Sequence, residues 1–222
     1  MVFAQRLKET NINYYIELSL KCKEMLIFSD WKSYNFGFDI SPYPFTSFSL
    51  IEDPHFRSKV DYLSRTPFDR TLYLDTDTVI FNRIVEIFGI LDRFDVGLTH
   101  AHHRNSKDRL MHWETEIPNA FPEFNSGVVL YRKTDSVISF FESWSSSYKK
   151  AGFRHDQTTL RELLWLSDLR IATLPPEYNL RFLKYYFLWS KSEAVPKIFH
   201  LKQLHMVWKH WFYKKIINQI RH

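Results

Sequence analysis

The sequence predicts a single α/β domain with a mainly parallel central sheet and helices on both faces of that sheet. Three observations support this fold class. Short apolar runs alternate along the chain with longer segments whose apolar residues recur at helical spacing. The chain has 222 residues, of which 45% are hydrophobic, so it is long enough to bury a sizeable core. No internal repeat or low-complexity tract interrupts the alternation.

The expected elements follow from this pattern in chain order. Strands are predicted at residues 2–4, 72–74, 79–81, 95–99, 126–132, 170–174 and 197–201. Helices are predicted at residues 12–28, 56–64, 82–91, 135–144 and 155–164, with Asn82 and either Thr134 or Asp135 as N-caps. Residues 29–50 are rich in turn formers. Residues 100–121 are expected to form a long irregular loop of the kind that covers a site.

Cysteine content and hydropathy restrict the cellular setting. Cys22 is the one cysteine, which excludes an intramolecular disulfide and a thiolate metal cluster and suggests a buried structural thiol. The first eight residues lack the long apolar segment of a secretory signal, and no run of about 18 apolar residues could span a bilayer. We therefore expect a cytoplasmic protein.

The formal net charge of +5 is concentrated near the C-terminus, where no acidic residue follows Glu193. Residues 203–222 also carry apolar side chains at roughly helical spacing, so they are predicted to form a basic amphipathic helix. One interpretation is a helix that packs its apolar face on the domain. The other is a peripheral contact with an anionic membrane at the inner membrane face. Nucleic acid is not an expected partner, because no recognisable binding module accompanies the charge.

An Asp-x-Asp pair follows the first strongly apolar strand. Asp75 and Asp77 come directly after residues 72–74, and ligands of open α/β sheets bind outside the carboxyl ends of strands. Two carboxylates there can hold a divalent cation, which in turn can hold a diphosphate. The alternative is an ordinary exposed turn. A second candidate group, His100, His102 and His103, lies on the expected loop, where histidines more often bind no metal.

The same residues also fit a phosphatase signature. Asp75-Thr-Asp77-Thr has the Asp-x-Asp-x-Thr form of haloacid-dehalogenase-type phosphatases, in which the first Asp is the nucleophile that accepts the phosphoryl group. That fold also needs an acidic pair to complete its Mg²⁺ site, and no Asp-Asp pair occurs in this sequence. The signature also comes late in the chain for such a phosphatase. This interpretation is therefore kept as an alternative.

Five blocks of sequence carry a resemblance to a known family. Their order and spacing resemble GT-A-fold nucleotide-diphospho-sugar glycosyltransferases, particularly those of the glycogenin and lipopolysaccharide-galactosyltransferase type. The resemblance covers roughly residues 55–202. The blocks are Arg70-Thr-Leu-Tyr-Leu-Asp75-Thr-Asp77-Thr, Phe121-Pro-Glu-Phe-Asn125-Ser-Gly127-Val-Val-Leu-Tyr-Arg132, His155-Asp156-Gln157, Leu174-Pro-Pro-Glu-Tyr178-Asn179 and Ile198-Phe-His200-Leu-Lys202.

The resemblance implies a GT-A fold and a role for each matched residue. Asp75, Asp77 and His200 would be the metal ligands, and two carboxylates with one imidazole suit Mn²⁺, or else Mg²⁺. The donor would also be bound by Lys59, Ser126, Gly127 and Lys202. The residues expected beside the reacting carbon of the donor sugar are Asn125, Asp156 and Gln157.

The activity implied by the resemblance is a metal-dependent transfer of a sugar from a nucleotide-diphosphate donor, expected to be a UDP-sugar. The acceptor would be a hydroxyl of a glycan, a lipid or a protein, and the anomeric configuration would be retained. If the reaction were inverting, Asp156 would be the candidate general base. A non-enzymatic alternative is a catalytically degenerate GT-A domain that binds a glycan or membrane surface. In either case residues 1–202 would form the GT-A-like domain and residues 203–222 the C-terminal helix.

Overall fold

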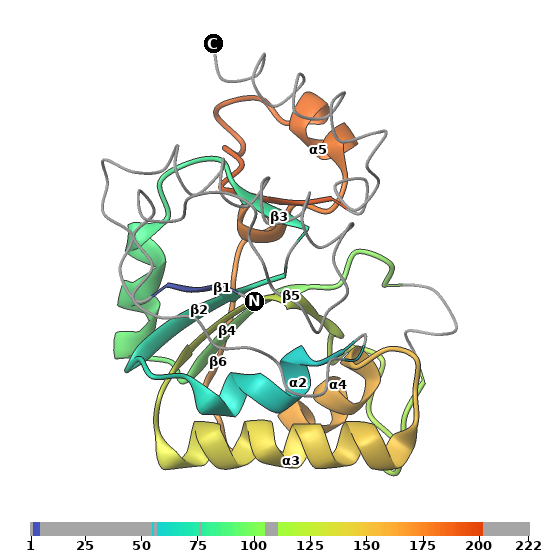
Figure 1. Cartoon of the computed structure of the whole chain (residues 1–222). Helices are drawn as coiled ribbons and strands as arrows, with labels where there is room; N and C mark the ends of the chain where they lie inside the picture. Colours follow the sequence, from blue (N-terminus) through green and yellow to red (C-terminus); the bar gives the residue numbers. More distant parts are fainter. Residues whose placement is uncertain (1, 5–54, 56, 76, 105–110, 202–222) are drawn as a thin grey trace.

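One five-stranded sheet and one two-stranded sheet organise the fold (Figure 1). The computed structural model describes residues 2–4, 55, 57–75, 77–104 and 111–201. The five-stranded sheet has the strand order β1-β2-β5-β4-β6, and the two-stranded sheet joins β3 to β7. In chain order the strands are β1 Val2–Ala4, β2 Arg70–Leu74, β3 Thr78–Ile80, β4 Val96–His100, β5 Phe124–Arg132, β6 Ile171–Thr173 and β7 Ile198–His200.

The strand directions correct the expectation of a mainly parallel sheet. Among the described strands of this sheet, β4 and β6 form the one parallel pair, whereas β1–β2, β2–β5 and β4–β5 are antiparallel. Strands β2, β4 and β6 still run the same way, because β5 lies between β2 and β4 and opposes both. The carboxyl ends of these three strands therefore meet at one edge, which is where α/β sheets bind ligands.

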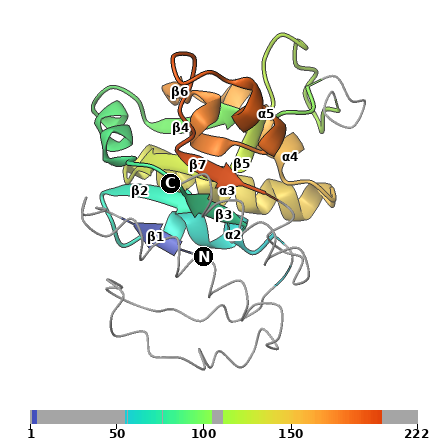
Figure 2. The same ribbon diagram turned by 90° about the horizontal axis from the view of Figure 1, so that it is seen from above.

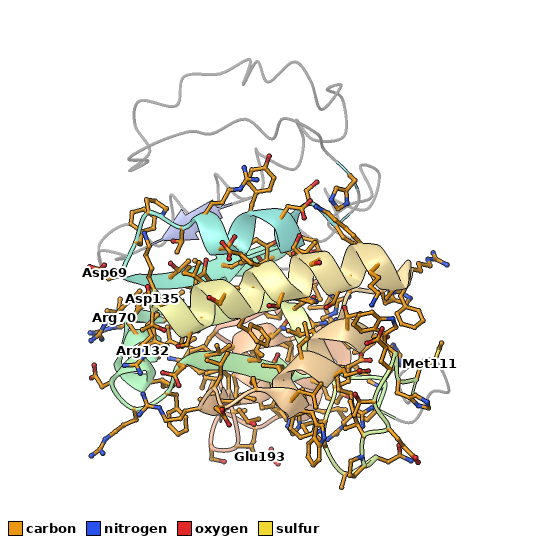
Figure 3. All side chains as sticks on the ribbon, turned by 90° about the horizontal axis from the view of Figure 1, so that it is seen from below. Asp69, Arg70, Met111, Arg132, Asp135 and Glu193 are labelled. Atoms are coloured by element: carbon orange, nitrogen blue, oxygen red, sulfur yellow. The ribbon has the colours of Figure 1, made fainter. Side chains whose placement is uncertain are left out.

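Three α-helices cover one face of the sheet (Figure 1). Alternate strand residues such as Tyr73, Val129 and Tyr131 face these helices, as the two-residue period of a strand requires. They pack with the buried Phe141 and Trp144, and Figure 3, seen from this side, shows the long third helix lying across the sheet. The helices are α2 Lys59–Tyr62, which continues as the 3-10 helix η2 Leu63–Arg65, α3 Asp135–Ala151 and α4 Gln157–Leu166.

Local signals fix both ends of α3. The hydroxyl of Thr134 accepts a hydrogen bond from the Val137 backbone N–H at 3.4 Å, which confirms Thr134 as the N-cap. Gly152 ends the helix in the left-handed region, with φ +65°, where a side chain would be strained. The helix therefore begins at the predicted position but ends at Ala151 rather than at residue 144, where its prediction ended.

The opposite face of the sheet is covered by the 3-10 helix η3 Val85–Asp92 and by the small sheet. The predicted helix at residues 82–91 is thus present, but as a 3-10 helix rather than an α-helix. Its N-cap is Ile84 rather than Asn82, whose side-chain oxygen only accepts a hydrogen bond from the next backbone N–H. Gly89 lies inside the segment and lowers its α-helical propensity.

The seven predicted strands lie within two residues of their expected bounds. The predicted helix at residues 56–64 corresponds to α2 and η2. Two elements were not predicted, the 3-10 helix η5 Pro176–Asn179 and α5 Leu183–Leu188. The predicted segments 12–28, 29–50 and 203–222 lie outside the described residues, as do Cys22 and Lys202. Within the described ranges, no helix is both long enough and apolar enough to cross a bilayer.

Residues 101–104 and 111–121 contain no helix or strand, as the prediction of a long loop requires. The second part is fixed to α4 by two buried charged residues. The carboxylate of Glu162 accepts hydrogen bonds from the backbone N–H groups of residues 113–115, at 2.8 to 3.1 Å. The guanidinium of Arg161 donates to the carbonyl oxygens of Pro118 and Phe121. Backbone groups of this loop segment thus obtain hydrogen-bond partners from a helix.

A buried carboxylate joins three neighbouring strands at the end of the sheet remote from Asp75. Asp95 Oδ1 accepts hydrogen bonds from Arg132 Nε at 2.8 Å and from Arg170 Nη2 at 3.0 Å. Its Oδ2 accepts from the Arg170 backbone N–H at 2.9 Å. The hydrogen bonds from Arg170, followed by those from Arg132, outweigh burial and hold the pKa of Asp95 well below its usual value.

We expect the substitution Asp95→Asn to lower the free energy of unfolding by about 2 kcal/mol at pH 7, the scale of lost hydrogen bonds to a charged group. Because the folded-state pKa is lowered, the stabilisation is complete above the unfolded pKa of about 4 and is lost as the pH falls further. Urea unfolding of both proteins at pH 7 and pH 3 tests this. A difference between them that does not shrink at pH 3 would contradict it.

Candidate functional site

Three side chains of metal-ligand type meet where the two sheets adjoin. Asp75 follows β2, Asp77 precedes β3, and His200 ends β7; β3 and β7 pair antiparallel, as seen from above in Figure 2. His200 Nε2 lies 3.0 Å from Asp77 Oδ1 and 3.7 Å from Asp75 Oδ2. One ligand atom from each residue lies within 4.8 Å of the others, and no other group of three in the described part of the chain has this property.

A glycine lets the imidazole approach strand β5. A Cβ atom added to Gly127 would lie 2.0 Å from His200 Cε1 and 2.8 Å from Asp75 Oδ2, distances that side chains do not tolerate. The Gly127 carbonyl also accepts a hydrogen bond from the Asp75 backbone N–H at 2.8 Å. The backbone of β5 is thus one wall of the cluster, and only a residue without a side chain leaves room for it.

The cluster is mostly buried, and its donor atoms fit a divalent cation. His200 is 2% exposed and Asp77 is 5% exposed. Burial lowers the pKa of His200 below its ordinary value, although the Asp77 carboxylate acts in the opposite direction. A neutral imidazole beside two carboxylates offers lone pairs to a cation, and carboxylate oxygen with imidazole nitrogen suits Mn²⁺ or Mg²⁺.

A buried lysine connects this cluster to the rest of the site. Lys59 Nζ donates to both carboxylate oxygens of Asp75 at 3.2 Å and to the Ser126 carbonyl oxygen at 3.0 Å. It also lies 3.6 Å from Asp156 Oδ2. The Tyr73 hydroxyl donates to Asp75 Oδ1 at 2.6 Å, and burial together with Asp75 raises the pKa of Tyr73 well above its ordinary value. Asp75 is therefore held in one position by an ammonium and a phenol.

Asp156 is fully buried at the N-terminus of α4, yet its side chain does not cap that helix. Its Oδ2 accepts a hydrogen bond from Ser126 Oγ at 2.6 Å, and its Oδ1 lies 3.3 Å from Arg57 Nε. Burial raises the pKa of Asp156, but the charges of Lys59 and Arg57 outweigh it and hold the pKa below its usual value. Asp156 is therefore held as a carboxylate by the two cations and by Ser126.

The remaining predicted site residues lie on the same edge of the sheet. Asn125 precedes Ser126 on β5, and its Oδ1 accepts hydrogen bonds from Gly127 N and from Asn179 Nδ2, both at 3.0 Å. Gln157 is buried as the first residue of α4. Hydrogen bonds, ion pairs or adjacency in the chain thus bring together every predicted site residue except Lys202, which lies outside the described residues.

The sequence-based prediction missed two cations of the site, Arg57 beside Asp156 and Arg181 beside Asp77. Arg181 Nη1 lies 3.8 Å from Asp77 Oδ2, and its side chain is 15% exposed. It lies there because Leu180 pairs with β7: the His200 backbone N–H donates to the Leu180 carbonyl at 2.9 Å. No motif in the sequence indicates this pairing. The matched sequence block that ends at Asn179 does not include the two residues that follow it.

The histidines of the loop after β4 are not part of a metal group within the described residues. The His102 ring instead packs edge-on against Phe182, with ring centroids 5.5 Å apart, and also contacts Tyr185. Burial, followed by the charge of Arg181, lowers the pKa of His102 to about 4. His102 is therefore a neutral aromatic ring that packs against the segment carrying Arg181.

Comparisons with known proteins agree with the fold. The model of a family described as nucleotide-diphospho-sugar transferase matches residues 70–215. A comparison with curated protein sequences gives no match.

Several solved structures are similar. The bifunctional glycosyltransferase WbbM has a TM-score of 0.51 and 17% identity, over 85% of this chain and 44% of that one. The galactosyltransferase LgtC, in complex with donor and acceptor sugar analogs, has a TM-score of 0.48 and 15% identity, over 73% of this chain and 66% of that one. Mouse xyloside xylosyltransferase 1 has a TM-score of 0.43 and 19% identity, over 64% of this chain and 63% of that one. The chain thus spans 44% to 66% of these three proteins, and the similarity to WbbM shows a shared fold.

We expect the substitution Gly127→Ala to lower the free energy of unfolding by about 2 kcal/mol, the scale of overpacking in a filled core. For a chain of this size that corresponds to a decrease in melting temperature of about 4–8 °C. The control is Gly89→Ala, because nothing lies within 4 Å of a Cβ added there and its φ is ordinary. Thermal unfolding of the two variants tests this, and equal melting temperatures would refute the close approach of His200 to β5.

Proposed function

Because the chain belongs to the nucleotide-diphospho-sugar transferase family, we propose that it is a glycosyltransferase that moves a sugar from a nucleotide-diphosphate donor to a hydroxyl acceptor. The donor is a UDP-sugar, the acceptor is a glycan, a lipid or a protein, and the anomeric configuration is retained. The observation that carries this proposal is the cluster of Asp75, Asp77 and His200 at the carboxyl end of β2. The family assignment replaces the phosphatase interpretation of the same Asp-x-Asp pair.

In this proposal the two carboxylates and the imidazole hold one divalent cation, Mn²⁺ or Mg²⁺. When bound, such an ion neutralises charge on the diphosphate of the donor and on the nucleoside diphosphate as it departs. The rigid support of Asp75 by Lys59 and Tyr73 favours this role, because a ligand held in advance loses little freedom on binding.

The positive charges around the cluster suit an anionic donor. Lys59 and Arg181 approach the carboxylates from different elements, Lys59 at Asp75 and Arg181 at Asp77. We assign Arg181 to the diphosphate, alongside the predicted contribution of Lys202. Ser126, Gly127 and Gln157 then contact the donor sugar where β5 and α4 meet. Phosphoryl oxygens are bound well by guanidinium groups, which present several donors in a fixed plane.

The chemistry proposed here needs no protein nucleophile. The acceptor hydroxyl attacks the anomeric carbon on the face from which the diphosphate departs. The bond from that carbon to the diphosphate oxygen breaks, a bond to the acceptor oxygen forms, and the acceptor proton passes to a phosphate oxygen. Asp156 is suited to orienting Ser126 and Lys59 rather than to attack, because its oxygens are buried against Arg57, Lys59 and Ser126.

The remaining parts of the proposal come from the sequence. They are a GT-A-like domain at residues 1–202, a basic amphipathic helix at 203–222 that contacts a membrane surface, and a cytoplasmic location. A catalytically degenerate domain that binds a glycan or membrane surface is the competing function.

We expect UDP with Mn²⁺ to raise the melting temperature of the protein by several degrees, and UDP without Mn²⁺ to raise it much less. Ligand at 100 times its dissociation constant stabilises a fold by about 2.7 kcal/mol. The substitution Asp77→Asn should remove the Mn²⁺-dependent part and abolish sugar transfer while the fold is retained. Asp92→Asn, which changes a 61% exposed carboxylate, is the matched control and should behave as the parent protein.

The outcomes distinguish the competing functions. A Mn²⁺-dependent shift that Asp77→Asn abolishes supports the donor site and justifies a screen of UDP-sugars. A variant that keeps near-parental transfer would refute the role of Asp77. Absence of a shift with UDP and with every other nucleotide would favour the degenerate binding domain.

We expect Arg181→Gln to weaken UDP binding in the presence of Mn²⁺ about tenfold, the effect of losing one charge-assisted hydrogen bond. Isothermal titration calorimetry of UDP against the Mn²⁺-loaded protein measures this. Arg93→Gln removes an exposed guanidinium beyond the end of η3 and is the control, with unchanged affinity expected. Equal UDP affinity in the two variants would show that Arg181 does not contact the diphosphate.

A further inference from the structure

Two buried asparagines connect the backbone of β5 to the imidazole of His200. Asn179 is the last residue of η5 and is 0% exposed, and Asn125 lies on β5 and is 9% exposed. Asn179 Nδ2 donates to Asn125 Oδ1 at 3.0 Å, and Asn179 Oδ1 lies 2.7 Å from His200 Nδ1. Neither asparagine can turn toward solvent to obtain other partners.

The direction of each hydrogen bond in this series follows from the first bond, which the Gly127 backbone N–H donates to Asn125. The Gly127 backbone N–H can only donate, and it lies 3.0 Å from one terminal atom of Asn125, which must therefore be the oxygen. The atom of Asn179 that meets this oxygen must be its amide nitrogen. The other terminal atom of Asn179 is then the carbonyl oxygen, which can only accept.

This order determines which ring nitrogen of His200 carries the proton. Because Asn179 presents an acceptor, Nδ1 must carry the hydrogen of the 2.7 Å contact. In the neutral imidazole the lone pair then lies on Nε2, which is the nitrogen that faces Asp77 at 3.0 Å and Asp75 at 3.7 Å. Three acceptor atoms converge at that point, so a cation or a proton must lie between them.

We propose that Asn179, oriented by Asn125, is a positioning residue that keeps the His200 proton on Nδ1 and so reserves Nε2 for the divalent cation. The inference rests on the proposed function, because it concerns the ligand set of the same metal site. Partners that hold the second nitrogen of a ligating histidine commonly change metal affinity by about 10- to 100-fold. Here that partner is a neutral amide whose orientation is determined by a strand backbone.

The wall formed by Gly127 adds to this effect. The backbone of β5 lies against the His200 ring, at the position where a Cβ would be 2.0 Å from Cε1 and 2.7 Å from Nδ1. A ring rotated by 180° would exchange Nδ1 for a carbon and lose the hydrogen bond to Asn179. Gly127 therefore holds the His200 ring in two ways. Its backbone contacts the ring, and its N–H begins the series of hydrogen bonds that runs through Asn125 and Asn179 to Nδ1.

The test measures Mn²⁺ affinity and the protonation site of His200 separately. Free Mn²⁺ is followed by electron paramagnetic resonance during titration of the parent protein, Asn179→Ala and Asn179→Asp. We expect Asn179→Ala to bind Mn²⁺ about 10- to 100-fold more weakly. Asn179→Asp should recover most of this loss, because a carboxylate oxygen still accepts from Nδ1. Imidazole ¹⁵N shifts of the metal-free parent protein, assigned with His200→Gln, should show the hydrogen on Nδ1.

The control variant is Thr71→Val. It removes a buried hydrogen bond, the 2.6 Å contact between the hydroxyls of Thr66 and Thr71, at the other end of β2. Its melting temperature should fall while its Mn²⁺ affinity stays within threefold of the parent protein. This separates a general loss of stability from a specific loss of metal binding.

Three results would overturn the inference. They are a parental His200 with its hydrogen on Nε2, an Asn179→Ala variant that binds Mn²⁺ within threefold of the parent, or an Asn179→Asp variant that binds no better than Asn179→Ala. If Asn179→Ala does not fold, the parental ¹⁵N spectrum and the affinity of Asn179→Asp against that of Thr71→Val decide. A parent protein that binds no Mn²⁺ would instead refute the proposed function, and the inference with it.

Discussion

The ammonium group of Lys59 stabilises the negative charges of this site. It lies between two carboxylates, contacting Asp75 at 3.2 Å and Asp156 at 3.6 Å, and only 6% of Lys59 is exposed. Without a cation beside it, a carboxylate buried as deeply as that of Asp156 would take up a proton or open the fold, since an isolated buried charge is very costly. Because Lys59 also donates to the Ser126 carbonyl, it ties α2 to both β2 and β5.

The second constraint is the narrow space between β5 and β7. The two strands belong to different sheets, and His200 bridges them by packing against the backbone at Gly127. The pairing of β3 with β7 then brings Asp77 to the same ring, so the cluster forms only when both sheets are assembled. Metal binding and folding of this region are therefore expected to stabilise each other, as they do wherever ligands come from separate elements.

The charged groups around this junction are placed as the proposed chemistry requires. Asp156 is fully buried and is kept anionic by Lys59 and Arg57. Asp75, Asp77 and His200 offer lone pairs at one point, while Arg181 brings a positive charge to the edge of that point. Such a site supplies position and electrostatic stabilisation rather than a nucleophile, which is what departure of a diphosphate requires.

Most strands, the start of α3 and most residues of the candidate site could be predicted from the sequence. Apolar runs located the strands, Thr134 marked the start of α3, and motif order indicated Asp75, Asp77 and His200 because matched residues at strand ends share one edge. The direction of β5 and the positions of Arg181 and Asn179 beside the cluster became clear only from the assembled fold. These depend on which strand lies beside which and on contacts between residues far apart in the chain, such as the hydrogen bond from Asn179 to Asn125, 54 positions earlier, and no local pattern encodes such distant pairing.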